Sequence, residues 1–459
     1  MRPMTVKELL SAVGGELIAG APEETFSDVS TDSRTIPAGA LFVPLVGERF
    51  DGHDYIEKAL ASGAAGCLCA RAPERVPQGG FCIRVGDTLA ALGALAAWYR
   101  MQFALPVVQI TGSVGKTTCK EMIASVLAQR YETLKTEANY NNEIGTPQTL
   151  LRLEARHGAA VIETGMDHAG QIRYLGSLVR PTIAVITNVG DMHIEFLGSR
   201  ENILRAKCEI FEHLAPDGLA LMNGDDPLLN TVSVPQRTVR FGRSEGCAVR
   251  VTDVDDRGMD GVRCTVTTEK ARYALAIPAP GEHMIYAAAA AVAAGEALGL
   301  TAEEITRGIA AYEPAGARMR VERLAGGRIV LNDSYNAGPQ SMAAGLRTLA
   351  KTDAVRRIAM LGDMKELGTL TAQAHRDIGA LVGELGLDAL LCVGPACRDH
   401  MAPAARAAGC ADVRWYEKKE DAYADLTAAL CPGAAVLLKA SHFSGRFDLI
   451  ADYLRDYPF

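Results

Sequence analysis

Apolar positions recur along this chain in two patterns, one with the period of a β-strand and one with the period of a helix. Near the start, short apolar runs at 40–46, 64–70 and 80–85 predict strands. Helical patterns at 55–62 and 88–103 lie between and after them. This mixture predicts a small α/β unit at the beginning of the chain.

From residue 105 onward, buried strands alternate with helices. A helix from residue 117 to about residue 129 follows the first of these strands. A series of this kind predicts a parallel sheet, which binds its ligands beyond the carboxyl ends of its strands. The predicted strands are 107–111, 159–163, 182–187 and 219–223.

Further along, residues 248–277 alternate with period two and contain turn residues, so they predict a β-ribbon. The Ala-rich segment 284–298 predicts a helix that returns to the core. The Pro-Ala-Gly turn at 314–316 marks a domain boundary. The strand-length apolar runs after it predict a second doubly wound α/β domain. These runs are 328–331, 357–361, 389–393, 413–416 and 436–439.

The patterns together predict an α/β protein of three domains. Residues 1–104 form a small mixed α/β N-terminal domain, 105–314 a central parallel-sheet domain and 315–459 a C-terminal Rossmann-like domain. A chain of 459 residues is too long for one ordinary core, which agrees with this division.

Charge and composition exclude several classes of function. The formal net charge of -8 disfavours a protein that binds nucleic acid by neutralising phosphates. No apolar stretch reaches the ~18 residues that a membrane span needs, so membrane insertion is not expected. The eleven cysteines include no C-x-x-C pair, which is typical of a reduced, cytoplasmic protein.

The strongest local signal is a strand that runs into a Gly-rich turn and then a helix. Backbone N–H groups in such a turn point at a polyphosphate, and the helix N-terminus adds partial positive charge. We expect Lys116 to reach the β- and γ-phosphates and the Thr117 hydroxyl to bind Mg²⁺. The expected nucleotide-binding residues are Gly112, Ser113, Val114, Gly115, Lys116, Thr117 and Thr118.

Three further residues lie where a metal could bind. Glu163 ends a predicted strand of the same sheet, so its carboxylate is placed to hold Mg²⁺ bound to ATP. His193 follows the next strand and points to a second metal site of mixed character, for Mg²⁺ or Mn²⁺. Lys207 lies on a helix shortly after, and composition alone leaves it a surface charge.

Four motifs in combination resemble the Mur ligase family, whose members build the peptide of bacterial peptidoglycan precursors. They are Thr-Gly-x-x-Gly-Lys-Thr-Thr at 111–118, Glu-Thr-Gly at 163–165, Thr-Asn-x-Gly-x-x-His at 187–193 and Ala-Lys-x-Glu-Ile at 206–210. The resemblance implies a central domain that binds ATP and two Mg²⁺ ions. It also implies a carbamylated Lys207, because a carbamate turns a cation into an anionic oxygen ligand. The catalytic and metal-binding set is then Lys116, Thr117, Glu163, His193 and Lys207.

The flanking segments resemble the D-alanyl-D-alanine-adding branch of that family. Near the start they imply a uridine-binding domain, in which residues 30–34 and Gly47 approach the UDP group. Two further segments match the same branch. One is 136–147, which contains the pattern Asn-Asn-x-x-Gly-x-Pro, and the other is 332–342, which reads Asn-Asp-Ser-Tyr-Asn-Ala-Gly-Pro-Gln-Ser-Met. The substrate-binding residues implied are Ser30, Thr31, Asp32, Ser33, Arg34, Gly47, Asn139, Asn141, Asn142, Tyr335 and Asn336.

The resemblance implies a ligase that joins D-alanyl-D-alanine to UDP-N-acetylmuramoyl-tripeptide through an acyl phosphate. The C-terminal domain is expected to close before the reaction, and Arg318 is a candidate to stabilise the closed form. The further nucleotide-binding residues implied are His283, Arg318, Asn332 and Asp333. The protein is expected to be a cytoplasmic monomer. Another Mur-type ligase, such as the diamino-acid-adding enzyme, and a non-catalytic nucleotide-binding protein remain the alternatives.

Two positions depart from the family pattern. Met284 stands where an asparagine commonly meets adenine, so the sequence leaves the adenine contacts open. His442 stands where an arginine is frequent, so a permanent cation is replaced by a titratable one.

Overall fold

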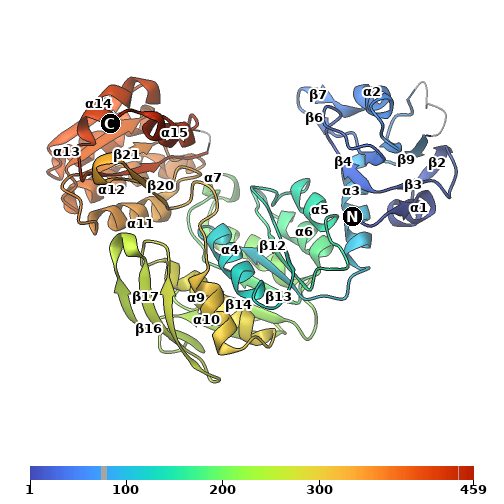
Figure 1. Ribbon diagram of the computed structural model, residues 1–459, viewed down its shortest axis with the longest axis horizontal. Helices are drawn as coiled ribbons and strands as arrows, with labels where there is room; N and C mark the ends of the chain where they lie inside the picture. Colours follow the sequence, from blue (N-terminus) through green and yellow to red (C-terminus); the bar gives the residue numbers. More distant parts are fainter. Residues whose placement is uncertain (74–79, 443) are drawn as a thin grey trace.

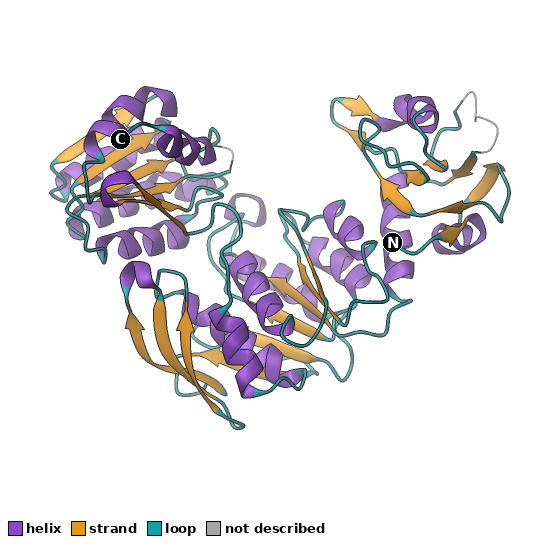
Figure 2. Ribbon diagram, in the orientation of Figure 1, coloured by secondary structure: helices purple, strands orange, loops and turns teal. Residues whose placement is uncertain are grey.

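The computed structural model describes residues 1–73, 80–442 and 444–459. Three large sheets follow one another along the chain, one at the N-terminal end, one in the middle and one at the C-terminal end (Figure 1). Figure 2 shows helices packed against the faces of each sheet. The α/β fold class with parallel sheets is therefore confirmed.

The N-terminal sheet has the strand order β2-β9-β8-β5-β4, and only β2 is antiparallel to its neighbour. A hairpin, β6–β7, lies outside it. Its strands are β2 (Glu16–Ala19), β4 (Asp28–Ser30), β5 (Ala40–Phe42), β8 (Gly66–Cys69) and β9 (Phe81–Arg84), and the hairpin is β6 (Val46–Gly47) and β7 (Phe50–Asp51). The helices are α1 (Val6–Val13), α2 (Ile56–Ala61) and α3 (Thr88–Arg100).

The central sheet has nine strands in the order β11-β12-β10-β13-β14-β15-β16-β17-β18, parallel as far as β16 and antiparallel beyond it. The strands are β10 (Val107–Thr111), β11 (Thr133–Lys135), β12 (Ala159–Glu163), β13 (Ile183–Ile186), β14 (Leu219–Asn223), β15 (Arg237–Gly242), β16 (Val249–Asp256), β17 (Val262–Thr267) and β18 (Arg272–Ile277). The helices are α4 (Lys116–Leu127), α5 (Gly145–Leu150), α6 (Gln171–Val179), α7 (Ile194–Leu197), α8 (Arg200–Cys208), α9 (Met284–Ala297) and α10 (Ala302–Ala310).

The C-terminal sheet has the order β19-β20-β24-β21-β22-β23, in which only β19 is antiparallel. Its strands are β19 (Arg320–Leu324), β20 (Arg328–Asn332), β21 (Arg357–Gly362), β22 (Ala389–Val393), β23 (Asp412–Tyr416) and β24 (Ala435–Lys439). The helices are α11 (Pro339–Ala350), α12 (Thr371–Glu384), α13 (Ala402–Ala407), α14 (Tyr423–Ala429) and α15 (Asp448–Asp456).

Helix α3 joins the first two sheets into one packed unit. It packs against α5 and α6 of the central part as well as against α1. Leu92, Leu95 and Tyr99 of α3 lie in the same buried cluster as Leu150 and Val179 of the central helices. The N-terminal core therefore continues across the predicted boundary at residue 104.

Most predicted strands occur at or near their expected bounds, and the predicted β-ribbon is the antiparallel end of the central sheet. The run 40–46 differs from the prediction because it divides into β5 and β6 around Pro44, which cannot donate to a strand ladder. The eleven cysteines all lie in the described segments and form no disulfide there. In those segments no helix is both long and apolar enough to cross a membrane.

A buried lysine and its partners join helix α4 to the end of strand β11. This strand precedes the Asn-rich loop, residues 139–142. Lys120 is 1% exposed and donates to the carbonyl oxygen of Thr136 at 2.5 Å. Its ammonium also lies 2.9 Å from the Glu121 carboxylate, which pairs on its other side with Lys135.

We expect Lys120→Met to lower the free energy of unfolding by about 3 kcal/mol, because it leaves the Thr136 carbonyl and part of the Glu121 charge without a partner. Chemical denaturation measures the change. Lys58→Met, on the exposed face of α2, is the control and is expected to stay within about 0.5 kcal/mol of the wild type. Equal stability of the two variants would contradict a structural role for Lys120.

Candidate active site

A cavity of about 750 Å³ lies between the central and C-terminal sheets. The central part contributes the phosphate loop and the loops after β12 and β13, and the C-terminal part contributes the loops after β20, β21 and β24. Parallel strands end with their carboxyl ends facing this space on both sides, the position at which α/β sheets bind ligands. The cavity is therefore lined by both the central and the C-terminal parts of the chain.

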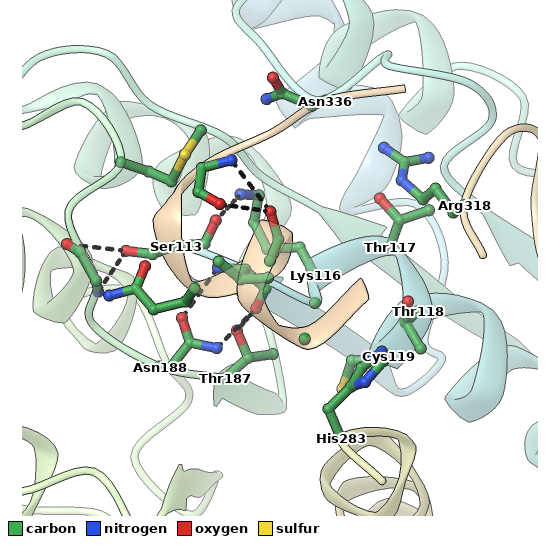
Figure 3. A pocket seen from close by; sticks show the side chains of 18 of the residues that line it. Ser113, Lys116, Thr117, Thr118, Cys119, Thr187, Asn188, His283, Arg318 and Asn336 are labelled. Carbon is green, nitrogen blue, oxygen red and sulfur yellow. Dashed lines mark hydrogen bonds between the residues drawn. The ribbon is translucent and has the colours of Figure 1, made fainter. Parts of the chain in front are cut away.

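The phosphate loop has the strand–turn–helix geometry that its sequence predicts. Gly112 and Gly115 have φ values of 151° and 80°, which favour glycine, and helix α4 begins at Lys116. The Lys116 ammonium donates to the Gly112 carbonyl oxygen at 2.8 Å, so it is folded back over the loop (Figure 3). Desolvation by the surrounding protein lowers the pKa of Lys116.

The segment 187–190 after β13 holds the phosphate loop in shape (Figure 3). The Asn188 side chain accepts from the Val114 N–H at 2.9 Å and donates to the Val114 carbonyl oxygen at 2.9 Å. The Thr187 hydroxyl donates to the same oxygen at 2.7 Å, and the Ser113 hydroxyl accepts from the Gly190 N–H at 2.8 Å. The loop conformation is therefore set by a neighbouring strand end as well as by its own glycines.

Glu163 and Thr117 form an oxygen pair at the base of the cavity. The Thr117 hydroxyl donates to the Glu163 carboxylate at 2.7 Å, and the Asn141 amide donates to its other oxygen at 2.9 Å. Glu163 is only 2% exposed. A carboxylate and a hydroxyl in contact beside a phosphate loop are donors that fit Mg²⁺, which prefers oxygen ligands.

Lys207 is buried at the end of helix α8 and is 1% exposed. It does not line the cavity, and no described residue hydrogen-bonds or ion-pairs with its amine. Burial, together with the nearby Lys116 charge, lowers the pKa of Lys207 well below its usual range. The expectation of a surface charge from composition alone is therefore wrong.

His193 lies at the cavity wall and meets a residue of the C-terminal part. Its Nδ1 atom is 2.7 Å from the Glu366 carboxylate, although the angles are those of an electrostatic contact rather than of a hydrogen bond. Nothing in the sequence analysis singled out Glu366 as a site residue. Two signals were available: its place four residues after strand β21, and the segment 361–368, which resembles the same branch of the family.

The C-terminal wall places several predicted residues together. The Arg318 guanidinium stacks on the Tyr335 ring at 3.8 Å. Asp333 accepts from the buried Lys439 ammonium at 2.5 Å, and Lys439 also donates to the Asn336 carbonyl oxygen at 3.0 Å. The predicted site residues that line the cavity on its two sides are Ser113, Val114, Gly115, Lys116, Thr117, Thr118, Asn139, Asn141, Asn142, Glu163, His193, His283, Arg318, Asp333, Tyr335 and Asn336.

Asn332 is not brought into the cavity. Its amide oxygen accepts from the Ser334 hydroxyl at 2.7 Å, and its amide nitrogen donates to Glu322 at 3.4 Å, so its polar atoms are held inside the C-terminal part. The prediction of a nucleotide contact from this side chain has no geometric support here. Met284, in contrast, is buried and lines the cavity.

The N-terminal residues expected to meet UDP lie outside the cavity. Ser30, Thr31, Asp32, Ser33, Arg34 and Gly47 are not among its lining residues. Arg34 and Asp32 pair with each other at the surface. The Thr31 hydroxyl nevertheless accepts from the Gln148 amide of α5 at 3.1 Å, which ties this segment to the helix that follows the Asn-rich loop.

Comparison with known proteins identifies the family. Family models match residues 25–100 (Mur ligase family, catalytic domain), 110–295 (Mur ligase middle domain) and 317–442 (Mur ligase, glutamate ligase domain). A UDP-N-acetylmuramoyl-tripeptide–D-alanyl-D-alanine ligase from Synechocystis is 37% identical over 440 residues, covering 94% of this chain and 93% of the relative. The chain belongs to the Mur ligase family.

Further proteins are similar to this Mur ligase over most of its length. The Escherichia coli enzyme is 38% identical over 398 residues, covering 86% of each chain. Among solved structures, MurF from Acinetobacter baumannii superposes with a TM-score of 0.91 at 31% identity over all of both chains. MurF from Thermotoga maritima, solved in complex with ADP, has a TM-score of 0.82 at 27% identity, covering 93% of this Mur ligase and 97% of that chain.

The phosphate loop of this Mur ligase requires glycine at position 112. A Cβ atom there would lie 1.9 Å from the Thr187 hydroxyl oxygen, at a φ that side chains rarely adopt. We expect Gly112→Ala to weaken binding of a non-hydrolysable ATP analogue at least ~10-fold, because a strain of a few kcal/mol opposes the closed loop. Isothermal titration calorimetry measures this. Gly246→Ala, whose Cβ meets no described atom within 4 Å, should bind the analogue like the wild type.

Proposed function

We propose that this protein is the ATP-dependent amide ligase that joins D-alanyl-D-alanine to UDP-N-acetylmuramoyl-tripeptide. The observation that carries the proposal is the likeness over nearly the whole chain to enzymes of that name, together with a cavity that joins a phosphate loop to a C-terminal wall. The products are UDP-N-acetylmuramoyl-pentapeptide, ADP and phosphate. We propose that this activity is divided among three domains, at residues 1–104, 105–314 and 315–459.

In this proposal, the tripeptide carboxylate attacks the γ-phosphorus of ATP, and the bond from that phosphorus to ADP breaks. Lys116 swings from the Gly112 carbonyl to the β- and γ-phosphates and neutralises their charge. The amine of D-alanyl-D-alanine then attacks the acyl phosphate, phosphate leaves and the amine loses a proton. Asn188 binds both the N–H and the carbonyl oxygen of Val114 and so keeps the loop backbone in one conformation during both steps.

Thr117, Glu163, His193 and Lys207 are the proposed metal-binding residues. Mg²⁺ held there would neutralise negative charge on the transferred phosphate, and Mn²⁺ is an alternative at the site that includes histidine. We propose two ions, one near the Thr117–Glu163 pair and one near His193. The oxygen pair supports the first because its atoms are already in contact.

Carbamylation of Lys207 is part of the proposal. Its amine attacks the carbon of CO₂, forms an N–C bond and releases a proton, which leaves a carbamate anion. Only an unprotonated amine can do this, and the burial that lowers the pKa of Lys207 favours that form. A carbamate would give this buried side chain an oxygen ligand for the second metal.

The two walls of the cavity divide the remaining roles. The nucleotide is proposed to contact residues 112–118 and His283 on the central side and Arg318 and Asp333 on the C-terminal side. The peptide substrates are proposed to contact Asn139, Asn141, Asn142, Tyr335 and Asn336. The UDP group is assigned to residues 30–34 and Gly47, which Thr31 ties to α5. A cytoplasmic location and a monomeric state stay predictions.

Phosphate release tests the substrate assignment. With ATP, Mg²⁺ and UDP-N-acetylmuramoyl-tripeptide, we expect D-alanyl-D-alanine to raise phosphate release at least ~100-fold, and a free diamino acid to have no such effect. Lys116→Ala is expected to reduce the rate by ~10³-fold, because it removes a cation from the developing charge. A diamino acid that replaced D-alanyl-D-alanine would overturn the substrate assignment. Full activity of Lys116→Ala would overturn the role of that lysine.

Chemical rescue tests the carbamate. Lys207→Ala is expected to lose at least ~100-fold in the rate of ligation, because a metal ligand is removed. A short carboxylic acid such as acetate or propionate in the millimolar range should restore part of the rate by supplying the missing carboxylate. The same acids should leave Lys116→Ala inactive, since that variant lacks a cation. No rescue, together with no carbamate signal from ¹³CO₂ in the NMR spectrum of the wild type, would contradict carbamylation.

A further inference from the structure

The contact between His193 and Glu366 joins two loops that belong to different sheets. His193 precedes helix α7 of the central part, and Glu366 follows strand β21 of the C-terminal part. Both residues have positive φ values, 64° and 61°, which are uncommon outside glycine. Backbone strain of this kind persists only where the surroundings enforce it, and it gathers at functional sites.

The loop that carries Glu366 is anchored on its own side. The Asp363 carboxylate accepts from the Cys397 N–H at 2.9 Å, and the Asp363 carbonyl oxygen accepts from the Ser444 hydroxyl at 2.8 Å. His375, completely buried, accepts from the Met364 N–H at 3.0 Å through Nε2. The Ser444 hydroxyl and the His375 ring therefore hold the backbone at residues 363 and 364, just before Glu366.

The loop that carries His193 is anchored in the same way. Arg200 makes two hydrogen bonds to the Asp191 carboxylate, at 2.6 and 2.7 Å. Gln340, the second residue of α11, donates to the same carboxylate at 3.2 Å. A Cβ atom at Gly190 would lie 2.6 Å from the Gln340 amide oxygen, so a larger residue there would displace the Gln340 side chain. Two C-terminal segments, the start of α11 and the loop after β21, thus contact the loop that carries His193. Glu366, in the loop after β21, reaches the imidazole.

We propose that Glu366 is a positioning residue of the metal centre, which orients the His193 ring and favours the tautomer with its proton on Nδ1. That tautomer leaves the lone pair of Nε2 for a metal, and a carboxylate beside the other nitrogen fixes the orientation of the ring. The inference rests on the proposed function, because it takes His193 as a metal ligand. It adds Glu366, a residue of the C-terminal domain, to the metal centre of the central domain.

The contact between His193 and Glu366 couples the two domains. Because Glu366 and His193 lie on different domains, the ring is oriented only when the domains are in contact. Any metal that binds better to the oriented ring must, by linkage, favour that contact to the same degree. Metal binding and domain contact therefore support each other.

Manganese binding measures the effect of Glu366 without catalysis. Mn²⁺ is titrated into the full-length protein with a non-hydrolysable ATP analogue, and free Mn²⁺ is followed by electron paramagnetic resonance. We expect Glu366→Ala to weaken Mn²⁺ binding about tenfold. We expect Glu366→Gln to weaken it about threefold, because the amide oxygen still faces Nδ1 but carries no charge. Glu384→Gln, an exposed carboxylate near the end of α12, is the control and should bind Mn²⁺ like the wild type.

Unchanged or tighter Mn²⁺ binding in Glu366→Ala and Glu366→Gln would overturn the inference, and tighter binding would mean that Glu366 blocks the ligand. If Glu366→Ala does not fold, Glu366→Gln decides alone. A second comparison uses His193→Ala, which removes the ligand itself. In that background, Glu366→Ala should cause no further loss of Mn²⁺ affinity, whereas an additive loss would contradict action through His193.

Steady-state rates give an independent measurement. Glu366→Ala should raise the Mg²⁺ concentration needed for half-maximal rate about tenfold, and saturating Mg²⁺ should return kcat to near the wild-type value. A fall in kcat that Mg²⁺ does not restore would count against positioning. Failure of this inference differs from failure of the proposed function. If the wild-type protein releases phosphate only with D-alanyl-D-alanine, the proposed function holds, even if substitutions at residue 366 leave the Mn²⁺ affinity unchanged.

Discussion

The paired hydrogen bonds between the Asn188 side chain and the Val114 backbone are the interaction on which the site depends. A glycine-rich loop is flexible by itself, and an amide that both donates and accepts at one residue selects a single conformation for it. Strands β10 and β13 are neighbours in the sheet, so sheet pairing brings the two loops together. Correct pairing of the central sheet thus precedes any ordered phosphate site.

Three buried lysines lie in this acidic protein, and they differ in how their charge is compensated. The net charge is -8, yet Lys120, Lys207 and Lys439 are each 2% exposed or less. Lys120 and Lys439 are compensated by carboxylates, Glu121 and Asp333. Lys207 has no such partner among the described residues, and its pKa falls accordingly. Local compensation, rather than the sum of charges, decides what each cation can do.

Sequence patterns predicted the parts of this protein that depend on local chemistry. Strands β10, β12 and β14 have the predicted bounds because each is a mostly apolar run that is buried on both faces. The phosphate loop and the cavity position of Glu163 followed from the rule that ligands bind beyond the carboxyl ends of parallel strands. Contacts between distant segments were not predictable. Asn332 faces its own domain, and Glu366 meets His193 across 173 residues of chain, which no periodicity encodes.

Helix α3 gives the N-terminal and central parts a shared buried core. Its apolar side chains share a core with α5 and α6, so unfolding of the N-terminal sheet alone would expose the apolar faces of two central helices to water. Heat or denaturant should therefore melt these two parts together. An N-terminal domain exchanged for this one would therefore have to bring its own version of helix α3, with apolar side chains that match α5 and α6.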